Sequence, residues 1–113
     1  MAYRQNPGKY RHVITIQKQT TVKDRYGQVT NSWSDVLKTR AAIYPLSGRE
    51  VLEADFVEGI ISHRIHIRHP RTIVINSQMR VLFGKRIFTI TSPPINYQEK
   101  NDELTILCKE EED

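Results

Sequence analysis

Hydrophobic and polar residues alternate along most of this chain, which is the pattern of β-strands with one buried face. The segment Met79 to Ile90 shows it on both sides of the dipeptide Gly84-Lys85. A two-residue turn there would gather the apolar residues of both halves on one face, namely Met79, Val81, Phe83, Phe88 and Ile90. Glycine suits the first position of a type II′ turn, which needs a positive φ. The segment therefore predicts a β-hairpin that forms one wall of the core.

Further strands are predicted where the same alternation recurs, at residues 11–18, 29–39, 40–46, 60–69 and 104–109. Asp24 to Gln28 supplies the turn after the first of them. Pro45 should end the third, because proline has no N–H to donate to a neighbouring strand. Residues 91–102 contain Pro93-Pro94 and are predicted to form a loop.

The segment Ser47 to Gly59 predicts the one α-helix. Ser47 and Glu50 have the spacing of a capping box, in which each side chain accepts a hydrogen bond from the other residue's backbone N–H. Leu52 and Phe56 are four residues apart and would form a buried stripe. Gly59 is suited to end the helix. Because the helix is short, we expect it to need packing or a partner to persist.

Six or seven short strands at close spacing are typical of small closed β-folds. The chain is thus predicted to be mainly β, a small six- to seven-stranded β-barrel with one short α-helix inserted between strands. Its 113 residues predict a single domain at 11–109, with a flexible N-terminal arm at 1–10 and an acidic tail at 110–113. The predicted core consists of Ile14, Ile16, Trp33, Leu52, Phe56, Ile65, Ile67, Val81, Phe83, Phe88, Ile90, Leu104 and Ile106.

Charge is distributed unevenly behind the net value of +4. Residues 1–49 are strongly basic, whereas residues 50–113 carry more acids than bases. No acid lies between Glu58 and Glu99, a stretch that holds the basic-face candidates Arg64, Arg68, Arg71, Arg80, Lys85 and Arg86. Such asymmetry can steer a polyanion or create complementary subunit contacts. The alternative is that these side chains are simply the solvated outer faces of strands.

The residue types that usually carry chemistry do not form a site in this sequence. On a strand, His66 faces away from His63 and His69, and those two lie about 20 Å apart, too far for one metal ion. Cys108 sits in an apolar strand, where a thiol is usually inert. The glycines match neither a phosphate-binding loop nor a dinucleotide fingerprint. We therefore predict no catalytic, cofactor or metal site, and an enzyme is disfavoured.

Two further observations concern the compartment. No apolar run approaches the roughly 20 residues that cross a membrane, and the N-terminus lacks the apolar segment of a secretory signal. The single cysteine excludes an internal disulfide and fits a reducing compartment. Synthesis in the cytoplasm without membrane association is the expectation.

Four blocks of sequence resemble a known family. PGKYRHVITIQ, YPLSGREVLEA, SHRIHIRHP and MRVLFGKRIFTI occur in this order and at spacings similar to the head–tail joining proteins of tailed bacteriophages and prophages, also called head closure or head–tail adaptor proteins. The resemblance covers about residues 6–109. It implies a virion protein, assembled in the host bacterial cytoplasm, that forms a ring below the portal and adaptor, closes the DNA-filled capsid and provides the docking surface for the tail.

The resemblance also implies partners: the portal or adaptor ring, tail proteins and further copies of the chain, with packaged DNA nearby. Because such a ring would form on the portal, we expect the isolated protein to be monomeric or weakly associated. In the family, the segment matching Ser47 to Ile61 projects toward the channel. The channel or subunit-interface candidates are Ser47, Arg49, Glu50, Glu53, Asp55 and Glu58. These acids could meet the basic face of a neighbouring copy or repel DNA in the channel, and the sequence favours neither.

Other functions compete with head closure. A tail-completion or terminator ring is closely related, because small connector proteins of that kind are also β-rich. A nucleic-acid-binding module of the small-barrel class is the alternative from a different class, since Phe83 and Phe88 lie within the basic stretch and aromatic rings on a basic sheet can stack bases. Against it, the hairpin pattern places both rings on the core face.

Overall fold

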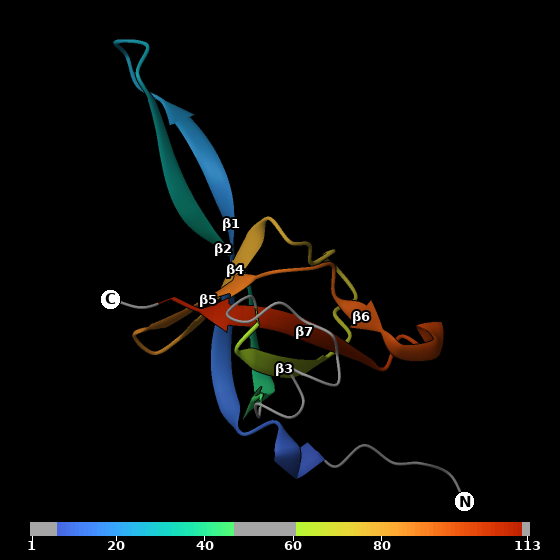
Figure 1. Cartoon of the computed structure of the whole chain (residues 1–113). Helices are drawn as coiled ribbons and strands as arrows, with labels where there is room; N and C mark the ends of the chain where they lie inside the picture. Colours follow the sequence, from blue (N-terminus) through green and yellow to red (C-terminus); the bar gives the residue numbers. More distant parts are fainter. Residues whose placement is uncertain (1–6, 47–60, 112–113) are drawn as a thin grey trace, which may run out of the picture.

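The computed structural model describes residues 7–46 and 61–111, and these form a mainly β protein, as predicted. Seven strands make a single antiparallel sheet (Figure 1). They are β1 (His12–Lys23), β2 (Val29–Pro45), β3 (His63–Arg68), β4 (Met79–Phe83), β5 (Arg86–Ile90), β6 (Ile95–Asn96) and β7 (Glu103–Glu110), with short 3-10 helices η1 (Pro7–Lys9) and η2 (Tyr97–Glu99). The predicted helix at 47–59 lies outside the described residues.

The strand pairings close into a ring. The order is β3-β2-β1-β4-β5-β7, and β7 pairs back with β3, while the two-residue β6 joins the side of β7. The inner faces of all six ring strands therefore converge on one core. Its buried residues include Ile14, Ile16, Ala41, Ile65, Ile67, Ile75, Val81, Phe88, Ile90, Leu104, Ile106 and Cys108.

The hairpin of β4 and β5 has the predicted register. Arg80 pairs with Thr89, Val81 with Phe88, Leu82 with Ile87 and Phe83 with Arg86. The φ of Gly84 is +61°, whereas Lys85 has no positive φ, so the turn has the glycine conformation expected at the first position of a type II′ turn. Turn chemistry and alternation together were sufficient to define this element.

Most of the predicted core residues that the structure describes are buried, but two differ. Phe83 is half-buried and packs against the edge of the core. Trp33 is 36% exposed and lies outside it. Leu52 and Phe56 belong to the segment that is not described.

The position of Trp33 follows from a β-bulge in β2. Ile16 pairs with Leu37 but Gln17 pairs with Asp35, so Val36 is an extra residue on β2. An extra residue reverses the in-and-out alternation beyond it. Leu37 and Ala41 therefore contact the core, whereas Trp33 points to the outer surface.

The pairing of β2 also corrects the predicted strand division. The sequence predicts separate strands at 29–39 and 40–46, yet β2 is one continuous strand of 17 residues. Alternation is broken at Val36 although backbone pairing with β1 continues on both sides. The predicted boundary between Thr39 and Arg40 lies beyond the bulge, in a stretch where pairing with β1 is uninterrupted.

Several ends also differ from the prediction. β1 continues past residue 18 to Lys23, and β6 lies inside the predicted loop. Lys9 and Tyr10, assigned to a flexible arm, are attached to the sheet, because Tyr10 is only 3% exposed and both side chains contact Glu103 on β7. Glu110, assigned to the acidic tail, is the last residue of β7 and pairs with Phe88.

Candidate assembly surfaces

A two-stranded hairpin projects from the closed part of the sheet. β1 pairs with β4 only at Thr15 to Lys18, and β2 pairs with β3 only from Ala41 onward. Beyond those points β1 and β2 pair only with each other within the described residues. Figure 1 shows them extending well away from the other strands. We call residues 19–33 the hairpin arm.

The tip of the arm is fixed by Asp24. Its Oδ1 accepts hydrogen bonds from the backbone N–H groups of Tyr26 and Gln28, both at 2.8 Å. The N–H of Asp24 donates to the carbonyl of Gln28, and Gly27 takes a φ of +82° that favours glycine. The predicted turn at 24–28 is confirmed, and it presents the Tyr26 ring 82% exposed.

The base of the arm is tied to β4 on the outer surface. The Arg80 guanidinium lies over the Trp33 ring, 4.2 Å from its centroid, and Arg80 Nε donates to Gln17 Oε1 at 2.9 Å. Gln17 Nε2 in turn donates to Asp35 Oδ1 at 2.7 Å. This cluster joins three strands, so it fixes the direction in which the arm leaves the sheet.

A second cluster attaches the N-terminal segment to β7. Lys9 Nζ lies 2.6 Å from Glu103 Oε2, and the Tyr10 hydroxyl donates to the same carboxylate oxygen. His66 Nδ1 lies 3.4 Å from the other carboxylate oxygen and 3.1 Å from Thr105 Oγ1. Glu103 therefore links the start of the described chain to its last strand. We call these four residues, Lys9, Tyr10, His66 and Glu103, the Glu103 cluster.

Burial and charge act on the pKa values in this cluster. Burial lowers the pKa of His66, and the Glu103 carboxylate opposes this only in part. Burial alone would raise the pKa of Glu103, but the hydrogen bonds from Lys9 and Tyr10 and the nearby His66 outweigh it, so that pKa is lowered. At neutral pH the cluster thus consists of a neutral imidazole beside a paired carboxylate.

Acidification should therefore destabilise the fold. A group whose pKa is lowered by folding stabilises the protein above its unfolded pKa and loses this effect as the pH falls through its folded pKa. For His66 the loss begins below its ordinary value of 6.5, and for Glu103 below 4.5. Urea unfolding between pH 8 and pH 3 should show the free energy of unfolding falling first below pH 6.5, as His66 is protonated, and again below pH 4.5, as Glu103 is protonated. His66→Gln should flatten the upper part of the curve in part, and the remainder should disappear when His63, whose pKa is also lowered by burial, is replaced as well. An unchanged slope in His66→Gln would contradict the prediction.

A third cluster closes the other end of β7. Arg86 forms a two-pronged contact with Glu110, with Nε at 2.7 Å from Oε2 and Nη2 at 3.0 Å from Oε1. The hydrogen bond to Arg86 lowers the pKa of Glu110, and the same bond raises that of Arg86. His63 packs edge-on against the Phe88 ring at 5.0 Å, and burial lowers its pKa. The Arg86–Glu110 ion pair and the His63–Phe88 ring contact therefore both connect β5 to neighbouring strands at this end of β7.

Neither histidine cluster has the composition of a metal site. His63 and His66 belong to separate clusters, and residues 7–46 and 61–111 contain no group of three His, Cys, Asp or Glu residues that could hold a metal ion. Cys108 is fully buried, and burial raises the pKa of its thiol to about 12. Its side chain is therefore a core group.

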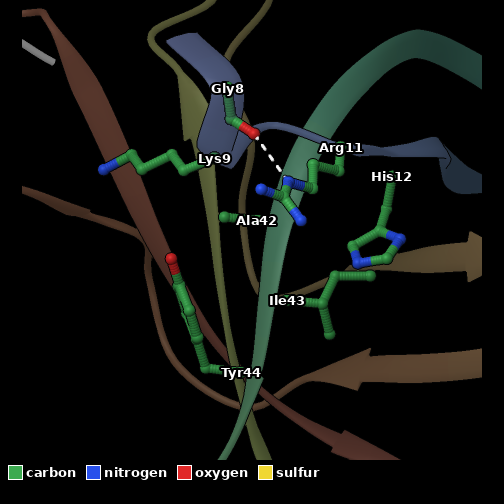
Figure 2. Close-up of a pocket in the computed structure, with 7 residues that line it drawn as sticks. All are labelled: Gly8, Lys9, Arg11, His12, Ala42, Ile43 and Tyr44. Atoms are coloured by element: carbon green, nitrogen blue, oxygen red, sulfur yellow. Dashed lines mark hydrogen bonds between the residues drawn. The ribbon is translucent and has the colours of Figure 1, made fainter. Parts of the chain in front are cut away.

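One surface hollow lies beside the N-terminal segment. It has a volume of about 280 Å³ and is lined by Gly8, Lys9, Arg11, His12, Ala42, Ile43 and Tyr44 (Figure 2). Arg11 Nε donates to the Gly8 carbonyl at 3.0 Å, which holds this guanidinium at the rim. The lining is basic and open, and it pairs no nucleophile with a carboxylate base. The hollow is thus a feature of the outer surface.

The basic-face candidates do not form one surface. Arg64 and Arg68 lie on β3 over the rings of Tyr44 and Tyr10. Arg80 contacts Trp33 at the base of the arm, and Arg86 pairs with Glu110. Lys85 is at the turn of the β4–β5 hairpin, and Arg71 is in the connector after β3. The channel or interface candidates Ser47, Arg49, Glu50, Glu53, Asp55 and Glu58 lie outside the described residues.

Sequence reasoning missed the hairpin arm and the Glu103 cluster. The sequence does carry one signal for the arm, because the stretches QTTV at 19–22 and VTNSWS at 29–34, on either side of the turn, contain no charged residue. The Glu103 cluster joins residues 93 positions apart, and no local pattern indicates such a contact.

No helix within the described part of the chain is both long and apolar enough to cross a membrane.

Comparisons with known proteins identify the family. The model of the phage head completion proteins matches residues 5–111. Head completion protein gp7 of Enterobacteria phage HK97 is 29% identical over 106 residues, which cover 91% of this chain and 94% of that protein.

Two solved structures are also similar. Protein SF1141 from Shigella flexneri 2a has a TM-score of 0.74 at 26% identity, covering 94% of this chain and 96% of that one. A chain of the virion of a native gene transfer agent particle has a TM-score of 0.61 at 16% identity, covering 89% of this chain and 94% of that one, which shows a shared fold. Because the family model spans nearly the whole sequence, the chain belongs to the phage head completion protein family.

Proposed function

We propose that this protein is a structural component of the head–tail connection in a tailed-phage virion. Copies of it form a ring below the portal and adaptor, close the DNA-filled capsid and give the tail its docking surface. The observation that carries the proposal is the family match over residues 5–111, together with end-to-end similarity to a head completion protein. Because the match covers the described fold as a whole, the function is assigned to the whole chain.

The fold suits a component that is built into a larger particle. In the closed ring of strand pairings, which we infer to be the predicted small β-barrel, β3, β4, β5 and β7 have partners on both sides, whereas β1 and β2 keep open edges outside residues 15–18 and 41–45. The hairpin arm and the basic surfaces lie outside it, where they are accessible to other proteins. A ring of identical subunits needs two different complementary patches on each copy, and the two open strand edges of the hairpin arm are candidates for them.

The structure gives little support to a nucleic-acid-binding module. Phe88 is fully buried, and Phe83 packs against the core and edge-on to the His12 ring at 4.9 Å. Phe88 cannot stack on a base without opening the sheet, and Phe83 is already engaged by the core and by His12. The proposed role is therefore assembly without catalysis or base recognition.

Deleting the gene from the phage that carries it should test the proposal. The expected result is heads that package DNA, then lose it, and carry no tails, with normal particles restored by the gene on a plasmid. Electron microscopy and nuclease sensitivity of the packaged DNA are the measurements. Stable DNA-filled heads beside tails of abnormal length would instead indicate a tail-completion protein. Normal virions would overturn both roles.

A further inference from the structure

The hairpin arm has two unpaired edges. On β1 the pairing with β4 ends at Lys18, and on β2 the pairing with β3 begins only at Ala41. The N–H of Asp24 donates to the carbonyl of Gln28, so these two residues form a hydrogen-bonded pair. Such pairs alternate with non-hydrogen-bonded pairs along an antiparallel ladder, so the even-numbered residues of the arm direct their backbone N–H and C=O groups toward the partner strand. The odd-numbered residues direct theirs outward. They are Gln19, Thr21 and Lys23 on β1 and Val29, Asn31 and Trp33 on β2.

The composition of these edges is unusual for exposed strands. Every residue from 21 to 33 is exposed, and 27% of the whole chain is charged. Among the outward-directed residues of the arm, however, Lys23 beside the turn is the single charged one, and residues 19–22 and 29–34 carry no charge. Val22 and Val29 are 53% and 63% exposed. Exposed edges are normally protected by charged side chains, proline or bulges, and an unprotected edge tends to pair with another strand. The one bulge of β2, at Val36, lies below the arm.

Space is available beside the β1 edge. Asn76 and Gln78 turn the chain into β4, with the Met79 N–H donating to the Asn76 carbonyl at 3.2 Å. A hollow of about 320 Å³ remains next to this turn, lined by Lys18, Gln19, Thr21, Asn31, Asn76, Gln78 and Met79. Only Lys18 is charged among these residues. The hollow lies over the face of the arm that carries Thr21 and its partner Asn31, and this face is open and mostly neutral. The β1 edge itself is open beyond Lys18 because β4 does not pair with it there.

A second copy of the chain fits both edges at once. When two arms lie side by side and point the same way, β2 of one copy runs antiparallel to β1 of the next, because the two strands of each arm are themselves antiparallel. The contact joins two different edges, and such heterologous contacts can close a ring. A two-fold pair would join β1 to β1 only with the arms pointing in opposite directions.

We propose that the hairpin arms of neighbouring copies pair edge to edge, β2 of one with β1 of the next, and form a continuous antiparallel sheet around the ring. This inference rests on the proposed virion role. Pairing would satisfy the outward backbone groups of Thr21 and Asn31 and remove the two open edges that each isolated copy carries.

Cross-linking in purified particles tests the pairing. Copies with Thr21→Cys are mixed with copies with Asn31→Cys and treated with a short bis-maleimide, while buried Cys108 is the background measured in unmodified protein. Links between the two variants are expected. Links between two copies of Thr21→Cys would indicate a two-fold contact. Particles that contain both variants without any link would show that the arms do not pair. Either result would overturn the proposed pairing but leave the virion role standing. Absence of both variants from particles would overturn the virion role as well.

A backbone variant gives an independent readout. Thr21→Pro removes an outward N–H without removing a hydrogen bond to β2, and Thr21→Val, the matched control, keeps that N–H. We expect the proline variant to keep the thermal unfolding transition of the unmodified protein and to lose head completion, while the valine variant completes heads. A folded proline variant that completes heads as well as the valine variant would overturn the inference. Amide exchange of the unmodified protein should show residues 21 and 31 protected only in particles, and equal exchange in free protein and particles would also overturn it.

Discussion

Replacing Phe88 with alanine should lower the free energy of unfolding by about 3–5 kcal/mol, the range for large aromatic side chains removed from a core. Phe88 is the largest fully buried side chain among the described residues. It pairs with Val81 on β4 and Glu110 on β7, and its ring contacts His63. The cavity would therefore open where three strands of the ring meet. Urea unfolding of both proteins is the measurement.

The adjacent residue provides the control for this effect. Ile87 points to the opposite face and is only half-buried, so Ile87→Ala should cost about 1 kcal/mol. If the Phe88→Ala protein is too unstable to purify, Phe88→Leu should still show a measurable loss. Equal losses in Ile87→Ala and Phe88→Ala would contradict the assignment of the inner face.

Shortening the hairpin arm should leave the free energy of unfolding nearly unchanged but abolish incorporation into particles. Thr20 and Ser32 are register partners whose hydroxyl oxygens lie 2.9 Å apart. Residues 21–31 can therefore be replaced by an Asn-Gly turn, which closes a two-residue hairpin between such partners. No arm residue belongs to the core, so the free energy of unfolding should change by about 1 kcal/mol or less. Incorporation into particles should be lost.

The control for the shortened arm is a change of side chain at its tip. Tyr26→Ser keeps both strands and the turn while it removes an aromatic residue that is 82% exposed. If Tyr26→Ser and the shortened arm fail to the same degree, the tip ring contacts the partner. If only the shortened-arm protein fails to enter particles, the strands of the arm, and not the Tyr26 ring, contact the partner. A shortened protein that enters particles normally would contradict an assembly role for the arm.

Local patterns in the sequence were sufficient where the structure is local. The β4–β5 hairpin has the predicted register because a glycine turn and strict alternation define both ends of the element. The turn at Asp24 was predicted for the same reason, since its hydrogen bonds join residues within four positions of each other. The overall β character followed from the alternation, and the family resemblance, confirmed by the comparisons, came from four separate blocks.

Features that depend on distant pairing could not be predicted in the same way. A single extra residue, Val36, changed the face of Trp33. Tyr10 looked like part of a mobile arm because its partner, Glu103, lies on the last strand. The basic residues of the acid-free stretch were grouped by sequence, yet they are carried by β3, a connector, β4, the β4–β5 turn and β5, and β3 and β4 lie on opposite sides of the ring of strand pairings.

The closed ring also has a kinetic consequence. Its pairings join residues far apart in the chain: Gln17 and Arg80 are 63 positions apart, and His63 and Cys108 are 45 apart. Chains dominated by such non-local contacts fold in milliseconds to seconds, whereas an isolated β-hairpin forms in about 1–10 μs. The arm, closed by its own turn at 24–28, is therefore able to form before the ring does. Each new copy then has its outward edges exposed while its core is still being completed, so the rate of ring closure sets how long a partly folded chain can pair with the wrong neighbour.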